Sequence, residues 1–73
     1  MNIYQINTVV CDAYYIETGD NISNVLTVLE DYSVSKFIKC FYYQSTFGED
    51  ATKVYVYVNK ERIVSVYPYK EEE

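Results

Sequence analysis

Apolar and polar positions alternate most clearly in the last third of the chain, from Lys53 to Tyr69. Valine alternates with tyrosine over residues 54–58, a polar stretch follows at 59–61, and alternation resumes from Ile63. A period of two sends successive side chains to opposite faces of a strand, so this segment predicts two strands joined as a hairpin. An odd number of loop residues keeps valines and tyrosines on separate faces, whereas a two-residue loop mixes them.

The odd register divides the predicted hairpin into a core face and an outer face. We expect the valines to lie against the core, and they are Val54, Val56, Val58, Val64 and Val66. The outer face then carries Tyr55, Tyr57, Ile63, Ser65, Tyr67 and Tyr69. Because the core does not need this outer face, we expect any recognition surface to lie there.

The first third of the chain predicts strands and then a helix. Two apolar stretches, 3–6 and 13–16, fit one long bent strand or, preferably, a hairpin that turns within 7–12. A single strand over 3–18 would exceed the usual strand length. Asp20 or Asn21 can cap a helix of about three turns. One apolar stripe follows at helical spacing, formed by Ile22, Val25, Leu26 and Leu29.

A long central strand is predicted over residues 36–47, with apolar side chains on both faces. One face carries Phe37, Phe41, Tyr43 and Phe47, and the other carries Ile38, Cys40 and Tyr42. The clearest loop covers 48–52, and Pro68 predicts that the last strand lies at a sheet edge or ends there.

The expected fold class is therefore α+β, a small curved antiparallel sheet of four to five strands with one helix packed on one face, in the order β-(β)-α-β-β-β. We expect one domain over 1–70, followed by an acidic tail at 71–73.

Tyrosine content and charge narrow the class of partner. Ten of the 73 residues are tyrosine, a residue enriched in protein interfaces because it combines a large apolar ring with a polar tip. The net charge is −5, and all six basic residues follow residue 35. This balance disfavours direct binding of nucleic acid and favours a larger protein or ribonucleoprotein with a basic surface.

The chain lacks the residues on which most enzymatic chemistry depends. It contains no histidine, and its two glycines, Gly19 and Gly48, are too far apart for a phosphate-binding loop. Cys11 and Cys40 show no metal or redox spacing and are expected to be buried free thiols, since a disulfide would need an oxidising compartment. We expect no enzymatic activity, no cofactor and no metal. With no apolar run long enough to cross a bilayer and no targeting segment expected, the predicted location is the cytoplasm.

Two sets of residues are candidates for partner binding. The electrostatic set is Glu17, Asp20, Glu30 and Asp31, and the aromatic set is Tyr55, Tyr57, Tyr67 and Tyr69. Three non-enzymatic hypotheses use them: an inhibitor of a nucleic-acid enzyme, a homodimeric structural or accessory subunit that pairs through its tyrosines or an edge strand, and a module that binds a small ligand or a peptide by strand addition. Binding to a basic partner should weaken steeply with salt, whereas a tyrosine-based dimer should persist.

The order of the predicted elements carries a resemblance to a known group of proteins. An opening hairpin over 3–6 and 13–17 leads into a polar-capped helix at 20–23, and three antiparallel strands end in an alternating hairpin. This layout resembles that of small phage-encoded anti-CRISPR proteins. The resemblance implies an inhibitor in the host cell cytoplasm that blocks the nucleic-acid path or the subunit contacts of a CRISPR effector. The balanced charge of residues 36–73 favours a localised acidic patch over mimicry of DNA by the whole molecule.

Overall fold

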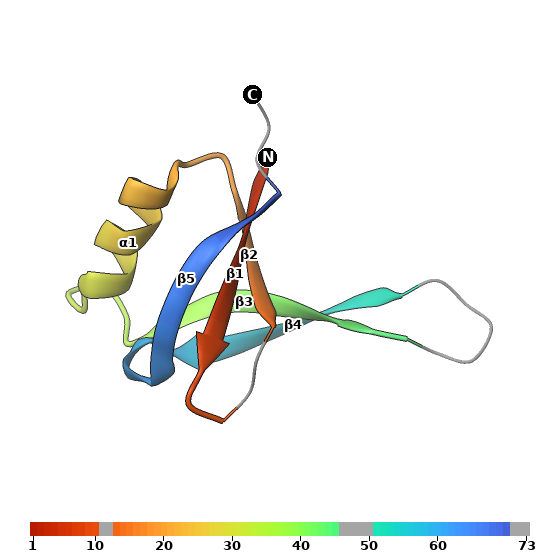
Figure 1. Cartoon of the computed structure of the whole chain (residues 1–73). Coiled ribbons are helices and arrows are strands. Elements are labelled where there is room, and N and C mark those ends of the chain that lie inside the picture. Colours follow the sequence, from red (N-terminus) through yellow and green to blue (C-terminus); the bar gives the residue numbers. More distant parts are fainter. Residues whose placement is uncertain (11–12, 46–50, 71–73) are drawn as a thin grey trace.

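The computed structural model describes residues 1–10, 13–45 and 51–70, which form five strands, one α-helix and one short 3-10 helix (Figure 1). In chain order these are β1 (Asn2–Thr8), β2 (Tyr14–Thr18), α1 (Ile22–Glu30), β3 (Phe37–Gln44), β4 (Thr52–Asn59), η1 (Lys60–Arg62) and β5 (Ile63–Lys70). The predicted acidic tail, Cys11 and most of the predicted 48–52 loop lie outside the described residues.

The opening segment is a hairpin, which confirms the preferred prediction over a single bent strand. β1 and β2 pair antiparallel from Asn2↔Thr18 to Ile6↔Tyr14. Ala13 enters β2 with a φ of 68°, in the left-handed region that non-glycine residues rarely adopt. The N–H of Ala13 donates a hydrogen bond to Oδ1 of Asn7 at 3.2 Å, which helps to hold this conformation.

The expected fold class is wrong in the arrangement of the strands, although the α+β content and the antiparallel pairing are as predicted. The sheet is flat to slightly curved rather than a curved sheet closed by a final hairpin, and its strand order is β4-β3-β2-β1-β5. β4 and β5 are therefore its two outer strands and do not pair with each other. β5 pairs with β1 instead, and the N–H of Lys60 after β4 donates to the carbonyl of Lys36 at 2.8 Å.

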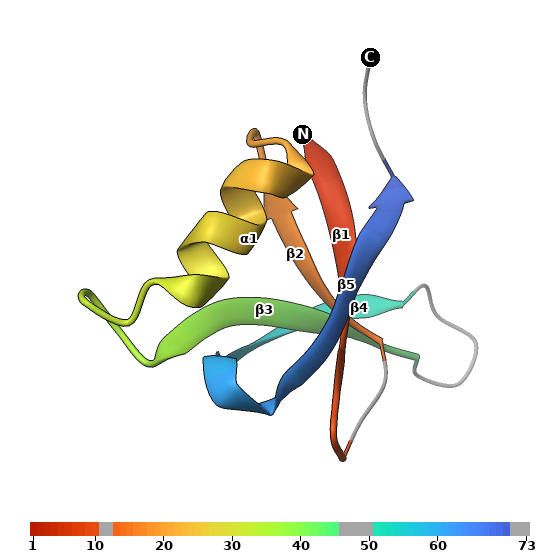
Figure 2. The same cartoon turned by 60° about the vertical axis from the view of Figure 1, so that its left-hand side comes forward.

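Two long ladders meet at a narrow junction in this sheet. β3 and β4 pair over eight positions, from Phe37↔Asn59 to Gln44↔Thr52, whereas β2 and β3 share one pair, Tyr15↔Phe41. The β3–β4 ribbon accordingly runs across the direction of β1, β2 and β5 (Figures 1 and 2). The η1 turn connects the two outer strands at one corner, and Oδ1 of Asn59 caps it by accepting from the N–H of Glu61 at 2.9 Å.

The hydrophobic core lies between α1 and one face of the sheet. Its buried members are Tyr4, Ile6, Ile16, Val25, Leu29, Cys40 and Val58. As predicted, Val56 and Val58 of β4 pack on this core. In β5 the predicted faces are right for Val66, which packs on the core, but wrong for the first two residues, because Ile63 packs on the core and Val64 is exposed. The cause is a register shift, because Asn7 faces Ser65 while Thr8 faces Ile63, which leaves Val64 as an extra residue.

The helix α1 begins where the polar pattern predicts. Oδ1 of Asn21 accepts a hydrogen bond from the N–H of Asn24 at 3.0 Å and so caps the first turn. Val25 and Leu29 enter the core, whereas Leu26, a member of the predicted stripe, remains 43% exposed beside β5. The helix is thus anchored by part of its apolar stripe, and the rest of that stripe borders a groove.

Candidate protein-interaction face

The face of the sheet opposite α1 is covered by aromatic side chains, and we call it the tyrosine face. Strand pairing places one continuous row of residues across all five strands: Tyr67, Gln5, Tyr15, Phe41 and Tyr55. Because Tyr4, Ile6 and Thr8 of β1 point into the core, Gln5 and the residues paired with it point to the other side. Tyr43, Tyr57 and Tyr69 extend the row along the strands and complete the tyrosine face.

Phe41 lies at the centre of the tyrosine face and is 1% exposed. Its ring stacks on Tyr15 with centroids 5.7 Å apart and meets Tyr43 edge-on at 5.5 Å. Tyr55 lies at 5.8 Å on the other side, and Nζ of Lys53 sits 4.8 Å above the ring. These contacts form a second apolar cluster, separate from the core under α1.

Tyr15 connects this cluster to the opposite edge of the sheet. Its ring lies 4.8 Å from the ring of Tyr69 on β5 and 5.3 Å from that of Tyr43 on β3. Partial burial, followed by the neighbouring hydroxyls of Tyr69, Tyr43 and Tyr67, raises the pKa of Tyr15. These neighbours therefore favour the protonated form of Tyr15, whose hydroxyl is engaged in a side-chain hydrogen bond with Tyr69.

Charged side chains on the tyrosine face are paired with rings or with each other. Nζ of Lys39 lies 4.8 Å from the centre of the Tyr55 ring. Nζ of Lys53 donates a hydrogen bond to Oε2 of Glu17 at 3.1 Å, and this bond is the main cause of the raised pKa of Lys53. Both partners of this ion pair are part-exposed, so the pair positions side chains more than it stabilises the fold.

All four tyrosines of the predicted aromatic set lie on the tyrosine face with their rings exposed. Tyr57 is the most open at 71%, and Tyr55, Tyr67 and Tyr69 are also exposed. The sequence did not identify Tyr15 and Phe41 as members of this surface. The sequence did place Phe41 and Tyr43 on one face of the predicted central strand, and this was the signal from which their membership could have been found. Only the pairing of β3 with β2 shows that these rings meet Tyr15.

The predicted electrostatic set is divided between two parts of the molecule, since Glu17 and Asp20 both line a pocket between the end of β2 and α1. Glu17 lies on the tyrosine face beside Lys53, whereas Asp20 precedes α1, where its carbonyl accepts the Tyr4 hydroxyl at 3.0 Å. Glu30 and Asp31 lie at the C-terminal end of α1. These side chains do not form the single acidic patch that the sequence suggested.

Asp31 has a local structural role at the end of α1. Its carboxylate accepts hydrogen bonds from the N–H of Ser33 at 2.9 Å and from the Ser33 hydroxyl at 2.5 Å. These two bonds hold the pKa of Asp31 below its ordinary value. The carbonyl of Asp31 accepts a third bond, from Nζ of Lys60 at 2.7 Å, which ties the end of the helix to the η1 turn.

The exposed tyrosines and the ring contacts beneath them make the tyrosine face the candidate site. Within residues 1–10, 13–45 and 51–70, no group of three or more Cys, Asp or Glu side chains is placed to hold a metal ion. In the same part of the chain, no helix has the length and apolar character needed to cross a membrane. Comparison with protein-family models, with curated proteins and with solved structures gave no match.

Proposed function

We propose that the protein is a non-enzymatic inhibitor that binds a larger protein or ribonucleoprotein through its tyrosine face. The observation that supports this most is the exposure of Tyr55, Tyr57, Tyr67 and Tyr69 on one side of a sheet whose other side carries the core. Exposed tyrosines on a flat surface are typical binding hot spots, because each ring supplies a large contact area at a small cost in side-chain entropy.

The buried centre of the tyrosine face prepares these rings for binding. Phe41 and Tyr15 support Tyr55 and Tyr69 from below through ring contacts of 5.8 and 4.8 Å. Side chains held on paired strands lose little further freedom when a partner covers them, so less of the contact energy is offset by ordering. The aromatic cluster thus supports both the stability of the sheet and the shape of the surface.

We further propose that the partner is a nucleic-acid-binding effector of a bacterial defence system, encountered in the cytoplasm of the host cell. The layout that resembles small anti-CRISPR proteins supports this proposal, together with the net charge of −5. A channel that holds phosphates is rich in Arg and Lys, and a guanidinium group stacks well on an exposed tyrosine ring. The overall charge would draw such a partner in, and the tyrosines would supply the contact.

A homodimeric subunit is the second candidate, and the strand order favours it. β4 and β5 are the outer strands of the sheet, so each has one edge that no other described strand covers. An uncovered edge can pair with the same edge of a second copy. In this case the tyrosine faces of two copies could form one larger surface.

Affinity capture from a bacterial lysate tests the inhibitor proposal. The immobilised wild-type chain is compared with Tyr57→Ala and with Val34→Ala, a control that truncates an exposed apolar side chain away from the tyrosine face. We expect a partner that Val34→Ala retains and Tyr57→Ala loses, and a retained amount that falls between low and high salt. Adding the purified protein should then reduce the nucleic-acid binding of that partner.

Two results would contradict the proposal. One is the recovery of nothing except the protein itself, with a molar mass in solution that doubles as concentration rises, which would favour the homodimer. The other is an equal loss of the partner in both variants, since this would place the contact outside the tyrosine face. Melting curves of the two variants, recorded in parallel, exclude a loss of binding through unfolding.

A further inference from the structure

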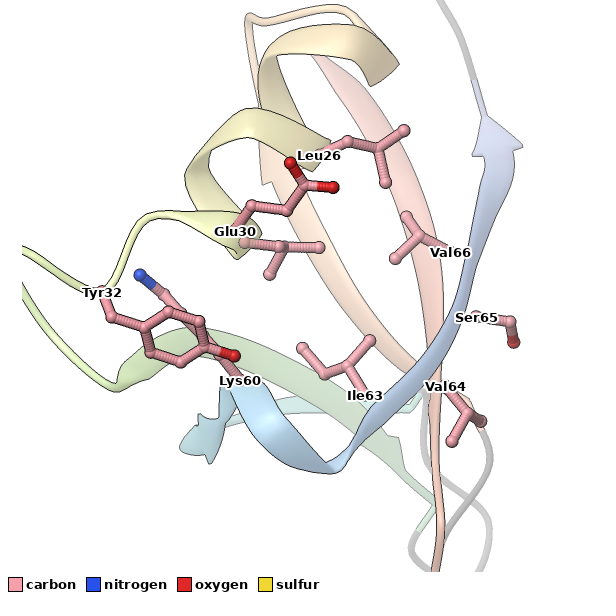
Figure 3. A pocket seen from close by; sticks show the side chains of 9 residues that line it. Leu26, Glu30, Tyr32, Lys60, Ile63, Val64, Ser65 and Val66 are labelled. Atoms are coloured by element: carbon pink, nitrogen blue, oxygen red, sulfur yellow. The ribbon is translucent and has the colours of Figure 1, made fainter.

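A groove of about 380 Å³ separates α1 from β5, away from the tyrosine face. Leu26 and Leu29 line it from the helix, and Ile63 and Val66 line it from the strand. Figure 3 shows Leu26 and Val66 pointing toward one another across the groove, whereas Ser65 points away. The walls are therefore apolar at this point of the groove, and part of this apolar surface is open, since Leu26 is an exposed residue.

The strand that borders the groove has an uncovered backbone edge. β5 pairs with β1 on one side, and no described strand lies on its other side. Pro68 is paired with Tyr4 and has no backbone N–H to donate. Antiparallel ladders alternate hydrogen-bonded and non-hydrogen-bonded pairs, and Pro68 fits a non-hydrogen-bonded pair, where its missing N–H removes no bond to β1. Alternation then turns the N–H and C=O of Val66, two residues earlier, toward the uncovered edge.

The charge along the groove is negative where the helix ends. Glu30 lines the groove in the last turn of α1, a turn that contains no basic residue. The helix macrodipole adds further negative potential at this end. Lys60 also lines the groove, but its Nζ already donates to the carbonyl of Asp31 at 2.7 Å and lies 5.8 Å from the centre of the Tyr32 ring. A cation from outside is therefore favoured beside Glu30.

We propose that this groove binds an extended peptide segment of another protein, which adds as a strand to β5. The segment places an apolar side chain between Leu26 and Val66 and a Lys or Arg beside Glu30. Side chains at i and i+2 of a strand share a face and lie roughly 7 Å apart, so a leucine and a lysine separated by one residue match the groove. This surface is separate from the tyrosine face and does not depend on the function proposed for it.

Titration of the ¹⁵N-labelled chain with synthetic peptides tests the proposal. The first peptide is Thr-Leu-Thr-Lys-Thr-Leu-Thr with blocked ends, and the second replaces its lysine with glutamate. Two further peptides keep the side chains of the first but carry N-methyl groups on every second backbone nitrogen. One of them is methylated at the odd-numbered residues and the other at the even-numbered residues. We expect saturable amide shifts at Leu26, Glu30 and Val66, with about tenfold weaker binding for the glutamate peptide and for one N-methylated peptide.

A pair of matched variants separates the groove from general electrostatics. Glu30→Gln should weaken the lysine peptide by about two- to fivefold, whereas Glu61→Gln, an exposed acidic residue of η1 that does not line the groove, should leave its affinity unchanged. Three results would overturn the proposal. The first is amide shifts confined to the tyrosine face, and the second is equal affinity for the lysine peptide and both of its N-methylated forms. The third is the absence of saturable shifts at millimolar peptide. Shifts at Val66 that depend on protein concentration without peptide would instead assign this edge to a second copy.

Discussion

Replacing Phe41 with leucine tests whether the tyrosine face contains a second apolar cluster that the fold requires. Phe41 is almost fully buried although it points away from the core under α1. Leucine keeps an apolar side chain at this position but removes the ring contacts with Tyr15, Tyr43 and Tyr55. The matched control is Tyr57→Leu, which removes an aromatic ring from the same face at a position that is 71% exposed.

The expected loss is a large part of the stability of so small a chain. At 73 residues, the free energy of unfolding is on the order of 4–11 kcal/mol. Phe41→Leu removes three ring pairs, each worth about 0.5–1.5 kcal/mol and not fully additive. With imperfect repacking around the leucine, we expect a total cost of about 2 kcal/mol. The exposed control should cost no more than about 0.5 kcal/mol.

Urea unfolding followed by far-ultraviolet circular dichroism measures both variants. With a slope of about 1 kcal/mol per molar urea for a small domain, the midpoint of Phe41→Leu should fall by about 2 M. The midpoint of Tyr57→Leu should move by about 0.5 M or less. If the two variants lose the same stability, the ring cluster around Phe41 does not contribute as a packed unit and the reasoning is refuted.

Three further predictions concern single side chains. Lys60→Met should lower the free energy of unfolding by about 1–3 kcal/mol, measured in urea, because the Asp31 carbonyl loses its donor; unchanged stability would contradict this. The pKa of Asp31 is lowered in the folded chain, so the Asp31 carboxylate contributes to stability above its unfolded pKa, and this contribution is lost as pH falls through the folded pKa. In Ser33→Ala, an NMR titration should show the pKa of Asp31 rising toward its ordinary value. Burial raises the pKa of the Cys40 thiol to about 12, so iodoacetamide at pH 8 should label Cys40 only after denaturation, as peptide mapping can check.

Short-range patterns predicted the local elements of this chain because their signals lie within a few residues. The cap at Asn21 and the spacing of Val25 and Leu29 were sufficient for α1. Alternation was sufficient to place Val58 in the core, and the excessive length of a single strand over 3–18 indicated the opening hairpin.

Strand order was wrong because the alternating pattern of the last third says which faces segregate but not which strand lies alongside. A hairpin and a connection between opposite edges of a sheet both fit a three-residue polar link. In the folded chain the N–H of Lys60 bonds to the Lys36 carbonyl, so β5 leaves β4 and pairs with β1. The extra residue at Val64 then exchanges the predicted faces of Ile63 and Val64 alone, and no glycine or other local signal marks that bulge.

The strand order also decides which aromatic residues can recognise a partner. In the row across the tyrosine face, Tyr15 and Phe41 belong to inner strands and have neighbours on both sides, so Phe41 is buried and Tyr15 is half-buried. Tyr55 and Tyr67 occupy the outer strands at the two ends of the row and stay exposed. The same type of residue therefore stabilises the sheet at the centre and is available for binding at the ends. It follows that alanine substitutions toward the ends of the row should separate binding from stability, whereas substitutions at its centre should affect both.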